Sequence, residues 1–468
     1  MSDTYDVAIL GAGPGGYVAA LRTAQLGARV ALVEKDRVGG TCLNVGCIPT
    51  KALTTSTELL LKTRRAHEFG VSIPSAVPDL PSLMAYKQAA VDGLVGGVEQ
   101  LLKKRRVTLV RGEGRLVRPD TLRVTDTAGN AVEVSARHVI LAPGSVPARP
   151  PIPGLDLPGV MTSTEALDIA DVPEHIVIIG GGVIGLEFAC IYEALGSQVT
   201  VLEMMPTLLP GATEEPLAKR LALILRRRGM AIHTGATVRA IEPAERGLRV
   251  IFAGARGEDA VEGARVLVAV GRWPNTDDLG LAGLGVKMNG RAVAVDEHLR
   301  TNLPNVWAIG DAAGGMMLAH KAMVDGRIVA ENVTGGKRAV DYRSVPSVIF
   351  TRPEVASVGL TEAEAHAQGA DVKVTKFPFS ANPRAQILGE TEGQVKLVCE
   401  AGSGRVLGVH LMGPHTTDLI AEGALAVQVG ATADDLAWTT HAHPTLPEAM
   451  LEAALGFRDA TIHFHSGR

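Results

Sequence analysis

A glycine-rich turn between an apolar strand and a helix constrains the fold of this chain more than any other feature, because it occurs twice. In the first copy a strand-like run over residues 5–10, apolar from residue 7 on, leads into Gly11, Gly13 and Gly16. A helix-like run follows, and a second apolar run ends at Glu34, 23 residues after the first glycine. This order predicts the strand, turn, helix and second strand of a dinucleotide-binding βαβ unit.

The second copy begins with the apolar run at residues 175–179, which leads into Gly180, Gly182 and Gly185. A helix and a strand follow, and the strand ends at Glu203, again 23 residues after the first glycine. In such a unit the three glycines make the turn, let the backbone approach a pyrophosphate, and let the helix pack on the strand, while the acid accepts hydrogen bonds from a ribose. Two units predict two bound dinucleotides. Two glycine-rich turns without a ligand are the alternative.

Two cysteines follow the first unit closely. Cys42 lies eight residues after Glu34, and Cys47 lies five residues further on. The four residues between them include no histidine or acid, which disfavours a zinc site, and no metal site is predicted. A structural disulfide fits poorly with only 4 cysteines in 468 residues and no other sign of secretion. The spacing therefore favours a redox-active pair beside a bound nucleotide.

Composition disfavours several classes of protein. The formal net charge of −4 argues against a nucleic-acid partner. No run approaches the ~18 consecutive apolar residues of a membrane span, and the first residues lack the basic stretch of a signal peptide. We therefore expect a cytoplasmic protein without nucleic-acid or membrane partners. Its length of 468 residues predicts roughly three domains.

The rest of the chain completes the predicted organisation. Residues 50–105 look largely helical apart from a proline-rich piece, and the proline-dense run at 147–158 suits a crossover into the second nucleotide unit. From about residue 342 the pattern changes to short strands and two helices without another glycine-rich turn. The predicted fold class is α/β, with two Rossmann-like dinucleotide-binding domains and a C-terminal α+β domain. The predicted segments are 1–148, 149–271, 272–341 and 342–468.

Several motifs together carry a resemblance to a known family. Besides the two glycine-rich turns they are the Cys42–Cys47 pair, Gly271-Arg272, Gly310-Asp311 and the run His-Ala-His-Pro-Thr at 441–445. Through them the chain resembles the pyridine nucleotide–disulfide oxidoreductases over essentially its whole length. The cysteine motif and the C-terminal histidine–proline motif together are highly specific to that family.

The resemblance implies a role for each segment. Residues 1–148 and 272–341 would be the two parts of an FAD-binding domain, 149–271 an NAD-binding domain, and 342–468 the dimerisation domain of a homodimer. The implied activity is oxidation of protein-bound dihydrolipoamide to lipoamide with NAD⁺, through a redox disulfide and FAD, as a component of 2-oxo acid dehydrogenase complexes. The sequence contains no lipoyl-domain segment, so the lipoyl domain is expected on a separate acyltransferase or carrier chain.

The resemblance also implies which residues bind the cofactors. Asp311 would bind the ribityl chain of FAD, the helix beginning near Ala319 would point its N-terminus at the flavin, and Lys51 would approach flavin N5 and pair with Glu187. Taken alone, Glu187 resembles a solvent-exposed helix residue. Arg272 would hold the nicotinamide nucleotide together with the second turn. The full implied set is Gly11, Gly13, Gly16, Glu34, Thr41, Lys51, Gly114, Gly144, Ser145, Asp311, Ala319, His320, Gly180, Gly182, Val183, Ile184, Gly185, Glu187, Glu203, Val238, Gly271 and Arg272.

The sequence departs from the family pattern at two prolines. Pro143 stands where the family usually has threonine, and proline has no N–H to offer a flavin. Pro447 stands before Glu448, where the family commonly has serine. We expect neither proline to touch the redox groups.

The cysteine pair is assigned distinct roles. Cys47 precedes Pro49, a suitable first-turn residue of the next helix, and a helix N-terminus together with Lys51 would lower the pKa of a thiol. The resemblance implies that Cys42 exchanges with substrate sulfur and that Cys47 passes electrons to the flavin. The two remaining cysteines, Cys190 and Cys399, stand in apolar runs and are interpreted as core residues.

The acid–base group is assigned to His443 with Glu448. A histidine in a loop is more often structural than catalytic, but a carboxylate on the far ring nitrogen would fix its tautomer and stabilise the imidazolium. The resemblance implies that His443 is the general base and reaches the flavin of the other subunit. His441 is interpreted as structural.

Three alternatives to this activity remain. A glutathione-reductase-like enzyme would use NADP, whose 2′-phosphate Glu203 would repel. A mercuric-reductase-like enzyme needs a cysteine pair near the C-terminus, whereas the last cysteine here is Cys399. The third alternative is a catalytically silent member of the family, and the presence of Cys42, Cys47, His443 and Glu448 argues against it.

Overall fold

The computed structural model describes residues 4–255 and 257–464. The chain divides into two compact units, each made of several stretches of sequence. Unit 1 contains the chain up to Pro151 with Met161–Val172 and Val270–Val340, and unit 2 contains Ile152–Val160, Pro173–Ala269 and the chain from Asp341. Residues 161–172, which we assigned to the NAD-binding segment, therefore lie in unit 1. The four-segment domain division itself stays a prediction.

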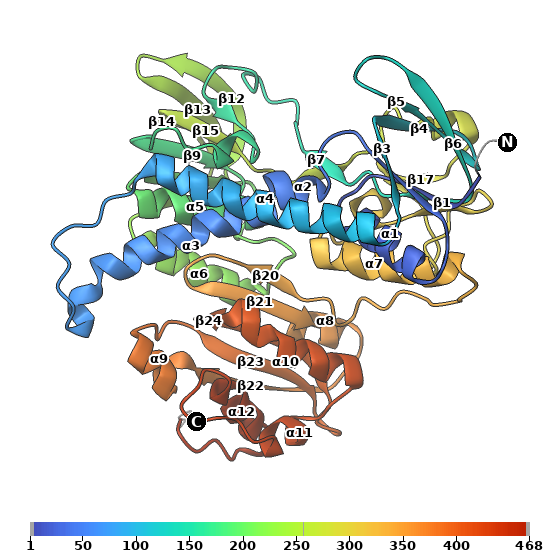
Figure 1. Cartoon of the computed structure of the whole chain (residues 1–468). Helices are drawn as coiled ribbons and strands as arrows, with labels where there is room; N and C mark the ends of the chain where they lie inside the picture. The colour runs from blue at the N-terminus through green and yellow to red at the C-terminus, as the bar shows by residue number, and fades with distance from the viewer. Residues whose placement is uncertain (1–3, 256, 465–468) are drawn as a thin grey trace. The chain divides into compact units, whose positions relative to one another are not determined.

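Unit 1 is built around one large sheet with helices beside it (Figure 1). Its elements in chain order are β1 (Tyr5–Leu10), α1 (Pro14–Gln25), β2 (Val30–Glu34), α2 (Gly40–Val45), α3 (Cys47–Arg64), η1 (Ala66–Phe69), α4 (Leu80–Lys104), β3 (Thr108–Arg111), β4 (Glu113–Arg118), β5 (Thr121–Thr125), β6 (Ala131–Leu141), β7 (Ser145–Pro147), η2 (Glu165–Leu167), β16 (Arg272–Pro274), η3 (Ala282–Leu284), β17 (Met288–Asn289), β18 (Ala292–Val293), β19 (Val306–Ala308), η4 (Gly310–Ala313) and α7 (Ala319–Val333).

The first predicted βαβ unit is confirmed as β1, α1 and β2. β1 pairs in parallel with β2 on one side and with β6 on the other, and the sheet runs β3-β2-β1-β6, with β19 parallel to β6. Val7 and Ile9 belong to one buried cluster, and Ala8 and Leu10 to another. Because successive side chains point to opposite faces, both faces of β1 are covered. This explains why residues 7–10 are apolar without alternation.

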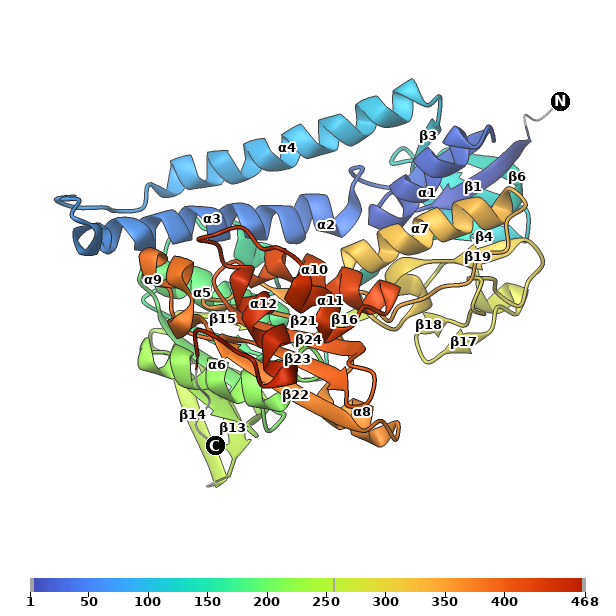
Figure 2. The same cartoon turned by 90° about the horizontal axis from the view of Figure 1, so that it is seen from below.

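The helices α1 and α7 lie side by side (Figure 2). A Cβ on Gly326 of α7 would lie 2.5 Å from the Gly15 carbonyl oxygen of α1, so this close approach requires glycine. Ala19 of α1 and Val329 of α7 belong to the same core cluster as Ile9. The contact fixes the start of α7 relative to the first glycine-rich turn.

Unit 2 contains two sheets of five strands and a three-stranded meander. Its elements are β9 (His175–Ile179), α5 (Val183–Leu195), β10 (Gln198–Glu203), α6 (Glu215–Arg227), β11 (Ala231–Thr234), β12 (Thr237–Ala244), β13 (Gly247–Gly254), β14 (Gly257–Gly263), β15 (Arg265–Val268), β20 (Ser347–Ile349), β21 (Glu354–Gly359), α8 (Glu362–Ala367), β22 (Val372–Pro378), η5 (Phe379–Ala381), α9 (Pro383–Leu388), β23 (Gln394–Glu400), β24 (Val406–Gly413), α10 (Thr416–Val429), α11 (Ala433–Trp438), α12 (Glu448–Leu455) and η6 (Gly456–Arg458), with β8 (Val160–Met161) where the two units meet in the sequence.

The second βαβ unit repeats the first. β9, α5 and β10 follow one another, and the sheet order is β11-β10-β9-β15-β8, with β9, β10, β11 and β15 parallel. Every residue of α5 from Gly185 to Leu195 except Glu193 is buried, so this helix is covered nearly all round. The glycine-rich turn thus stands at the carboxyl end of a central parallel strand, where ligands bind in open α/β sheets.

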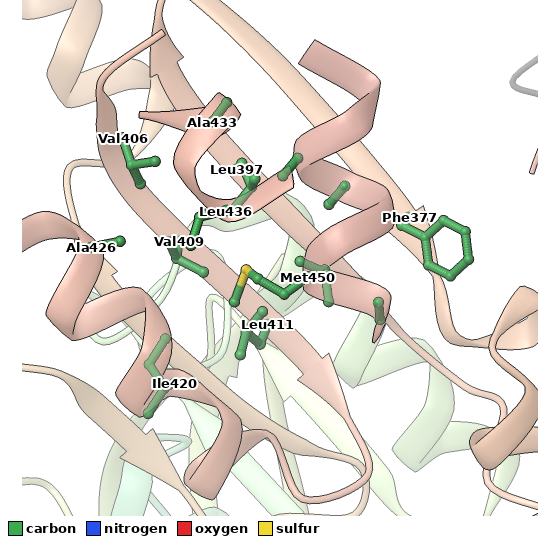
Figure 3. Close-up of a cluster of buried hydrophobic side chains, with 14 of the residues drawn as sticks. Phe377, Leu397, Val406, Val409, Leu411, Ile420, Ala426, Ala433, Leu436 and Met450 are labelled. Atoms are coloured by element: carbon green, nitrogen blue, oxygen red, sulfur yellow. The ribbon is translucent and has the colours of Figure 1, made fainter. Parts of the chain in front are cut away.

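The C-terminal part of unit 2 is α+β, as predicted. Its sheet, β20-β21-β24-β23-β22, is antiparallel throughout. Leu397 and Leu411 from the strands meet Ile420, Leu436 and Met450 from three helices in one buried cluster (Figure 3). Among the described residues this part holds five helices, α8 to α12, and not the two predicted, because α8, α9 and α11 span only six residues each and carry no clear periodicity.

Within the described part of the chain, no helix combines the length and apolar character needed to cross a membrane.

Candidate active site

The first glycine-rich turn has the shape that a pyrophosphate requires. Gly11 adopts a φ of +100°, and a Cβ on Gly16 would lie 1.8 Å from the Gly11 carbonyl oxygen, so both positions require glycine. A Cβ on Gly13, at the N-terminus of α1, would meet no described atom within 4 Å. No described side chain caps this helix. Its first amides are therefore open to an anionic ligand.

The second turn repeats this geometry at every glycine. Gly180 adopts a φ of +113°, a Cβ on Gly185 would lie 2.0 Å from the Gly180 carbonyl oxygen, and a Cβ on Gly182 would meet no described atom within 4 Å. Val183 and Ile184 form the first turn of α5, which no described side chain caps. Each glycine-rich turn and the helix N-terminus that follows it form a cradle for a pyrophosphate. The two cradles fit two dinucleotides, one in each unit.

The two acids also take equivalent places. Glu34 accepts hydrogen bonds from the amide of Ala12 at 2.7 Å and from the amide two residues after itself at 2.9 Å. Glu203 accepts from the amide of Gly181 at 2.7 Å and from the amide two residues after itself, also at 2.7 Å. Both side chains are buried. Each carboxylate ties its strand to the turn and carries negative charge where this fold binds ribose hydroxyls.

The two cysteines are brought together by a break between two helices. Cys42 lies in α2, and Cys47 is the first residue of α3, after Gly46 at the N-cap. The predicted helix start beside Cys47 is therefore confirmed. Gly46 is required here, since a Cβ would lie 2.9 Å from the Thr41 carbonyl oxygen. The two cysteine side chains are hydrogen bonded to each other.

The electrostatics of the pair distinguish its members. The hydrogen bond that the Cys42 thiol donates to Cys47, and then burial, raise the pKa of the Cys42 thiol, although the charge of Lys51 lowers it. Cys47 stands at the N-terminus of α3, whose partial positive charge stabilises an anion. When the pair is reduced, the raised pKa therefore keeps the proton on Cys42.

A polar network joins two distant stretches of unit 1. Ser145 donates its hydroxyl to Asp311 at 2.5 Å, and Arg272 donates to the Ser145 hydroxyl at 2.7 Å and to its carbonyl at 2.6 Å. Burial lowers the pKa of the Arg272 guanidinium, while the charges of Asp311 and Cys47 raise it. Three residues implied by the resemblance are thus assembled here. Arg272, which we grouped with the nicotinamide nucleotide, lies in the same unit as Asp311 and the cysteine pair.

The other implied cofactor residues are placed on several elements. Glu187 of α5 is buried, not solvent-exposed, and it accepts a hydrogen bond from the Phe350 amide at 3.1 Å. Ala319 and His320 are the first two residues of α7. The remaining positions are Thr41 in α2, Lys51 in α3, Gly114 in β4, Gly144 before β7, Gly271 before β16 and Val238 in β12. Their contacts with cofactors stay predictions.

The histidine and its acid form a short hydrogen-bonded pair in unit 2. His443 Nδ1 lies 2.8 Å from Glu448, the first residue of α12, and Glu448 also accepts from the Thr445 amide at 2.7 Å. Burial raises the pKa of Glu448, but the hydrogen bonds from Thr445 and His443 outweigh it, so the pKa is lowered. The His443 side chain is 69% exposed, which leaves its second nitrogen accessible. Glu448 thus holds the ring as the triad logic requires.

The other histidine and the other cysteines behave as structural groups. The His441 side chain is only 5% exposed, and its ring nitrogens contact Glu422 at 2.9 Å and the Thr439 carbonyl at 2.8 Å. Cys190 and Cys399 are buried. Burial raises the pKa of Cys399 to about 12 and also raises that of Cys190. Both thiols are therefore protonated and inert near neutral pH.

Sequence reasoning missed one residue at the cysteine pair. Tyr17 of α1 packs with Cys42 in a small cluster around Leu43 and Val91. Burial and then the charge of Cys42 raise the pKa of the Tyr17 phenol. Its place directly after the first glycine-rich turn is the only sequence signal that could have indicated it. Among the described residues, no group of three or more histidines, cysteines or acids could hold a metal ion.

Comparison with known proteins identifies the family. Residues 5–326 match the family model of the pyridine nucleotide-disulphide oxidoreductases, and residues 345–454 match the dimerisation domain of the same family. The chain belongs to the pyridine nucleotide-disulphide oxidoreductase family. This is a family of flavoprotein disulfide oxidoreductases whose cofactors are FAD and NAD.

Individual relatives cover nearly the full chain. Dihydrolipoyl dehydrogenase from Geobacillus stearothermophilus is 42% identical over 97% of this chain and 96% of its own length. The enzyme of that name from Thermus scotoductus is 43% identical over 98% of this chain and 99% of its own length.

Solved structures agree with the fold. LpdA from Mycobacterium tuberculosis superimposes with a TM-score of 0.89 at 30% identity, covering 96% of this chain and 98% of that one. The flavoprotein disulfide reductase RclA from Escherichia coli, as a Cu(II) complex, gives a TM-score of 0.86 at 31% identity, covering 97% and 99%.

Proposed function

We propose that this chain is a dihydrolipoamide dehydrogenase, which oxidises protein-bound dihydrolipoamide to lipoamide with NAD⁺ as acceptor. The observation that carries the proposal is the hydrogen-bonded pair Cys42 and Cys47 at the start of α3, in the same unit as an open dinucleotide cradle. Full-length relatives named dihydrolipoyl dehydrogenase support the substrate. The lipoyl group would be presented by a separate acyltransferase or carrier chain of a 2-oxo acid dehydrogenase complex.

The cysteines would receive the two electrons of the substrate. One thiolate of dihydrolipoamide attacks Cys42 of the Cys42–Cys47 disulfide and forms a mixed disulfide, while Cys47 leaves as a thiolate. The remaining substrate thiol then gives up its proton, its sulfur attacks the substrate sulfur of the mixed disulfide and releases lipoamide, and Cys42 departs and takes up that proton as a thiol, while the first proton stays on His443. The enzyme dithiol now holds the electrons. The raised pKa of Cys42 and the helix N-terminus beside Cys47 favour this distribution of the proton.

The histidine would move the proton. His443 Nε2 accepts a proton from a dihydrolipoamide thiol, which makes the thiolate that attacks. Glu448, at 2.8 Å from Nδ1, keeps Nε2 unprotonated beforehand and stabilises the charged ring afterwards. Because residues 345–454 match a dimerisation domain, we place His443 opposite the cysteine pair of the second chain in a homodimer.

The cofactors would occupy the two cradles. Bound FAD supplies a two-electron acceptor for the dithiol, and NAD⁺ supplies the final acceptor. Gly11, Gly13 and Gly16 with Glu34 hold the ADP half of FAD, and Asp311 holds its ribityl chain. Gly180, Gly182 and Gly185 with Glu203 hold NAD⁺.

Coenzyme choice tests the role of Glu203. Its carboxylate would repel the 2′-phosphate of NADP, and residues 204–212 contain no arginine or lysine to bind that phosphate. We expect kcat/KM for NAD(H) to exceed that for NADP(H) by at least about tenfold, which corresponds to roughly 1.4 kcal/mol. Steady-state assays with both coenzymes measure this ratio.

Substitutions at the two equivalent acids distinguish the effect of the Glu203 charge on coenzyme choice from the effect of losing a buried acid that bonds the turn. Glu203→Ala should weaken NAD(H) use and reduce the discrimination. Glu34→Ala, which removes the same pair of backbone contacts from the other unit, should weaken FAD retention and leave the coenzyme ratio unchanged. Equal efficiency of the wild-type protein with NAD(H) and NADP(H) would exclude the proposed role of Glu203.

One comparative assay tests the proposed activity. The purified protein should be yellow and should turn over lipoamide with NADH far faster than oxidised glutathione or mercuric ion. Substrate preference is measured as kcat/KM for each of the three acceptors. A preference for glutathione or mercuric ion would assign the chain to a different reductase, and no turnover of any acceptor would indicate a catalytically silent member.

A further inference from the structure

A buried ion pair in α7 has no part in the chemistry described so far. Lys321 and Asp325 are one helical turn apart, 2.8 Å separates their charged atoms, and their side chains are 3% and 0% exposed. Both lie in unit 1, as does the turn that carries Asp311. Burying two charges costs more free energy than burying two apolar side chains of similar volume. A contribution to the stability of the fold therefore does not explain this pair.

Local helix preferences also oppose the pair. Lys321 is the third residue of α7, where the helix N-terminus is partly positive and disfavours a cation. The order lysine before acid at a spacing of four residues is the less favourable orientation on a helix. The position of Lys321 must therefore be explained by contacts outside α7.

Three such contacts go to one turn. Lys321 Nζ donates to the carbonyl of Gly310 at 3.3 Å and to the carbonyl of Gly314 at 3.5 Å. Asp325 accepts a hydrogen bond from the Gly310 amide at 2.9 Å. The two charges thus hold both ends of the turn 310–314, and Asp311 is its second residue.

The turn has a glycine in the left-handed region at each end. Gly310 and Gly314 adopt φ values of +66° and +75°, and a hydrogen bond from the Gly314 amide to the Asp311 carbonyl at 3.0 Å caps the one-turn 3₁₀ helix η4 between them. On the other side, the Asp311 side chain is met by the Ser145 hydroxyl at 2.5 Å. A change in the turn would therefore move the carboxylate away from Ser145.

We infer that Lys321 and Asp325 are positioning residues that clamp the turn 310–314 and so fix the Asp311 carboxylate for FAD. The inference rests on the proposed function in that Asp311 is taken to bind the flavin nucleotide. It assigns to two buried residues of α7 a role in cofactor retention.

The test replaces the charges without leaving either one unpaired. In the double variant Lys321→Met/Asp325→Leu, apolar side chains fill the same space, which buried ion pairs tolerate. We expect FAD to leave the holoprotein at least about tenfold faster, since each lost hydrogen bond to a charged group weakens the turn by about that factor. FAD release is followed by the rise in flavin fluorescence on dilution. The urea midpoint of the deflavinated full-length chain should stay near that of the wild type.

Unit 1 offers a matched control. Lys87 of α4 is also a buried lysine, with contacts to Asp168 at 2.7 Å and to the Leu167 carbonyl at 2.9 Å, and it does not contact the turn 310–314. Lys87→Met should lower the urea midpoint and leave the rate of FAD release unchanged. The comparison separates loss of a buried lysine from loss of the clamp.

Each outcome decides the inference. Wild-type rates of FAD release in the double variant would overturn it. If the double variant does not fold, Lys321→Met alone decides: faster FAD release than in Lys87→Met supports the clamp, and equal release contradicts it. A wild-type protein that binds no FAD would overturn both the proposed function and the clamp, whereas a yellow wild type with an equally stable double-variant flavoprotein would overturn the clamp alone.

Discussion

Replacing His443 with alanine should slow dihydrolipoamide oxidation by about 10²-fold or more, the usual effect of losing a general base. The substrate thiol would then have to lose its proton to water before attacking Cys42. FAD should stay bound, since His443 lies in the other unit from the FAD cradle and its ring contacts Glu448. The rate is measured with dihydrolipoamide and NAD⁺, and FAD content is measured by the visible spectrum of the same sample.

The chain contains a matched control for this variant. His463 Nδ1 lies 2.7 Å from Glu452 in the middle of α12, and its side chain is 67% exposed, so the pair resembles that of His443 and Glu448. His463→Ala should leave the rate within a few-fold of the wild type. Glu448→Ala should slow it, but less than His443→Ala does, because the imidazole remains and only its orientation and stabilisation are lost.

Mixing variants tests whether His443 acts on the second chain. His443→Ala and Cys42→Ser are each expected to be inactive as homodimers. After subunit exchange, a heterodimer should contain one site with an intact cysteine pair and an intact His443, so activity should return in part. Heterodimers that form but stay inactive would show that His443 serves the cysteine pair of its own chain.

The two cysteine substitutions should have opposite spectroscopic effects. In Cys42→Ser, Cys47 has no disulfide partner and is expected to be a thiolate at the start of α3. A long-wavelength charge-transfer band from this thiolate to bound FAD should therefore appear without any reductant. In Cys47→Ser the band should be absent under all conditions. Both variants should lose dihydrolipoamide oxidation altogether, because neither can form the disulfide.

A third cysteine provides the comparison for this experiment. Cys190→Ala removes a buried thiol of α5 and should change neither the band nor the rate. If Cys42→Ser lacks the band at neutral pH while FAD is bound, the roles assigned to the two cysteines are wrong. Visible spectra across neutral pH, recorded before and after adding a dithiol, make the distinction.

The parts of the fold that sequence predicts are those encoded by short local patterns. The turns at Gly11 and Gly180 could be predicted because backbone geometry permits only glycine there, and a strand covered on both faces must be apolar throughout. The start of α3 at Cys47 was indicated by Pro49. The C-terminal α+β domain was predicted, but three six-residue helices in it were not, because one and a half turns are too short to show a period.

The parts that sequence did not predict depend on contacts between distant residues. Taken alone, Glu187 resembles a solvent-exposed helix residue, and only the family resemblance assigns it to the site; in the structure α5 is buried on nearly every side and Glu187 accepts a hydrogen bond from the Phe350 amide. The bridge from Arg272 to Ser145 spans 127 residues, and no local pattern records it. Lys321 and Asp325 at a spacing of four resemble an ordinary surface pair on a helix, and only tertiary structure shows that they are buried.

The most direct test of the account is a single turnover with dihydrolipoamide in the absence of NAD⁺. We expect one equivalent of lipoamide to be released per chain, the long-wavelength band to appear, and an alkylating reagent then to label the Cys42–Cys47 pair while Cys190 and Cys399 stay unlabelled. Peptide mapping after alkylation locates the label. Release of lipoamide without labelling of either cysteine of the pair, or no reaction between dihydrolipoamide and a protein that contains FAD, would contradict the claim that Cys42 and Cys47 form the redox centre for this substrate.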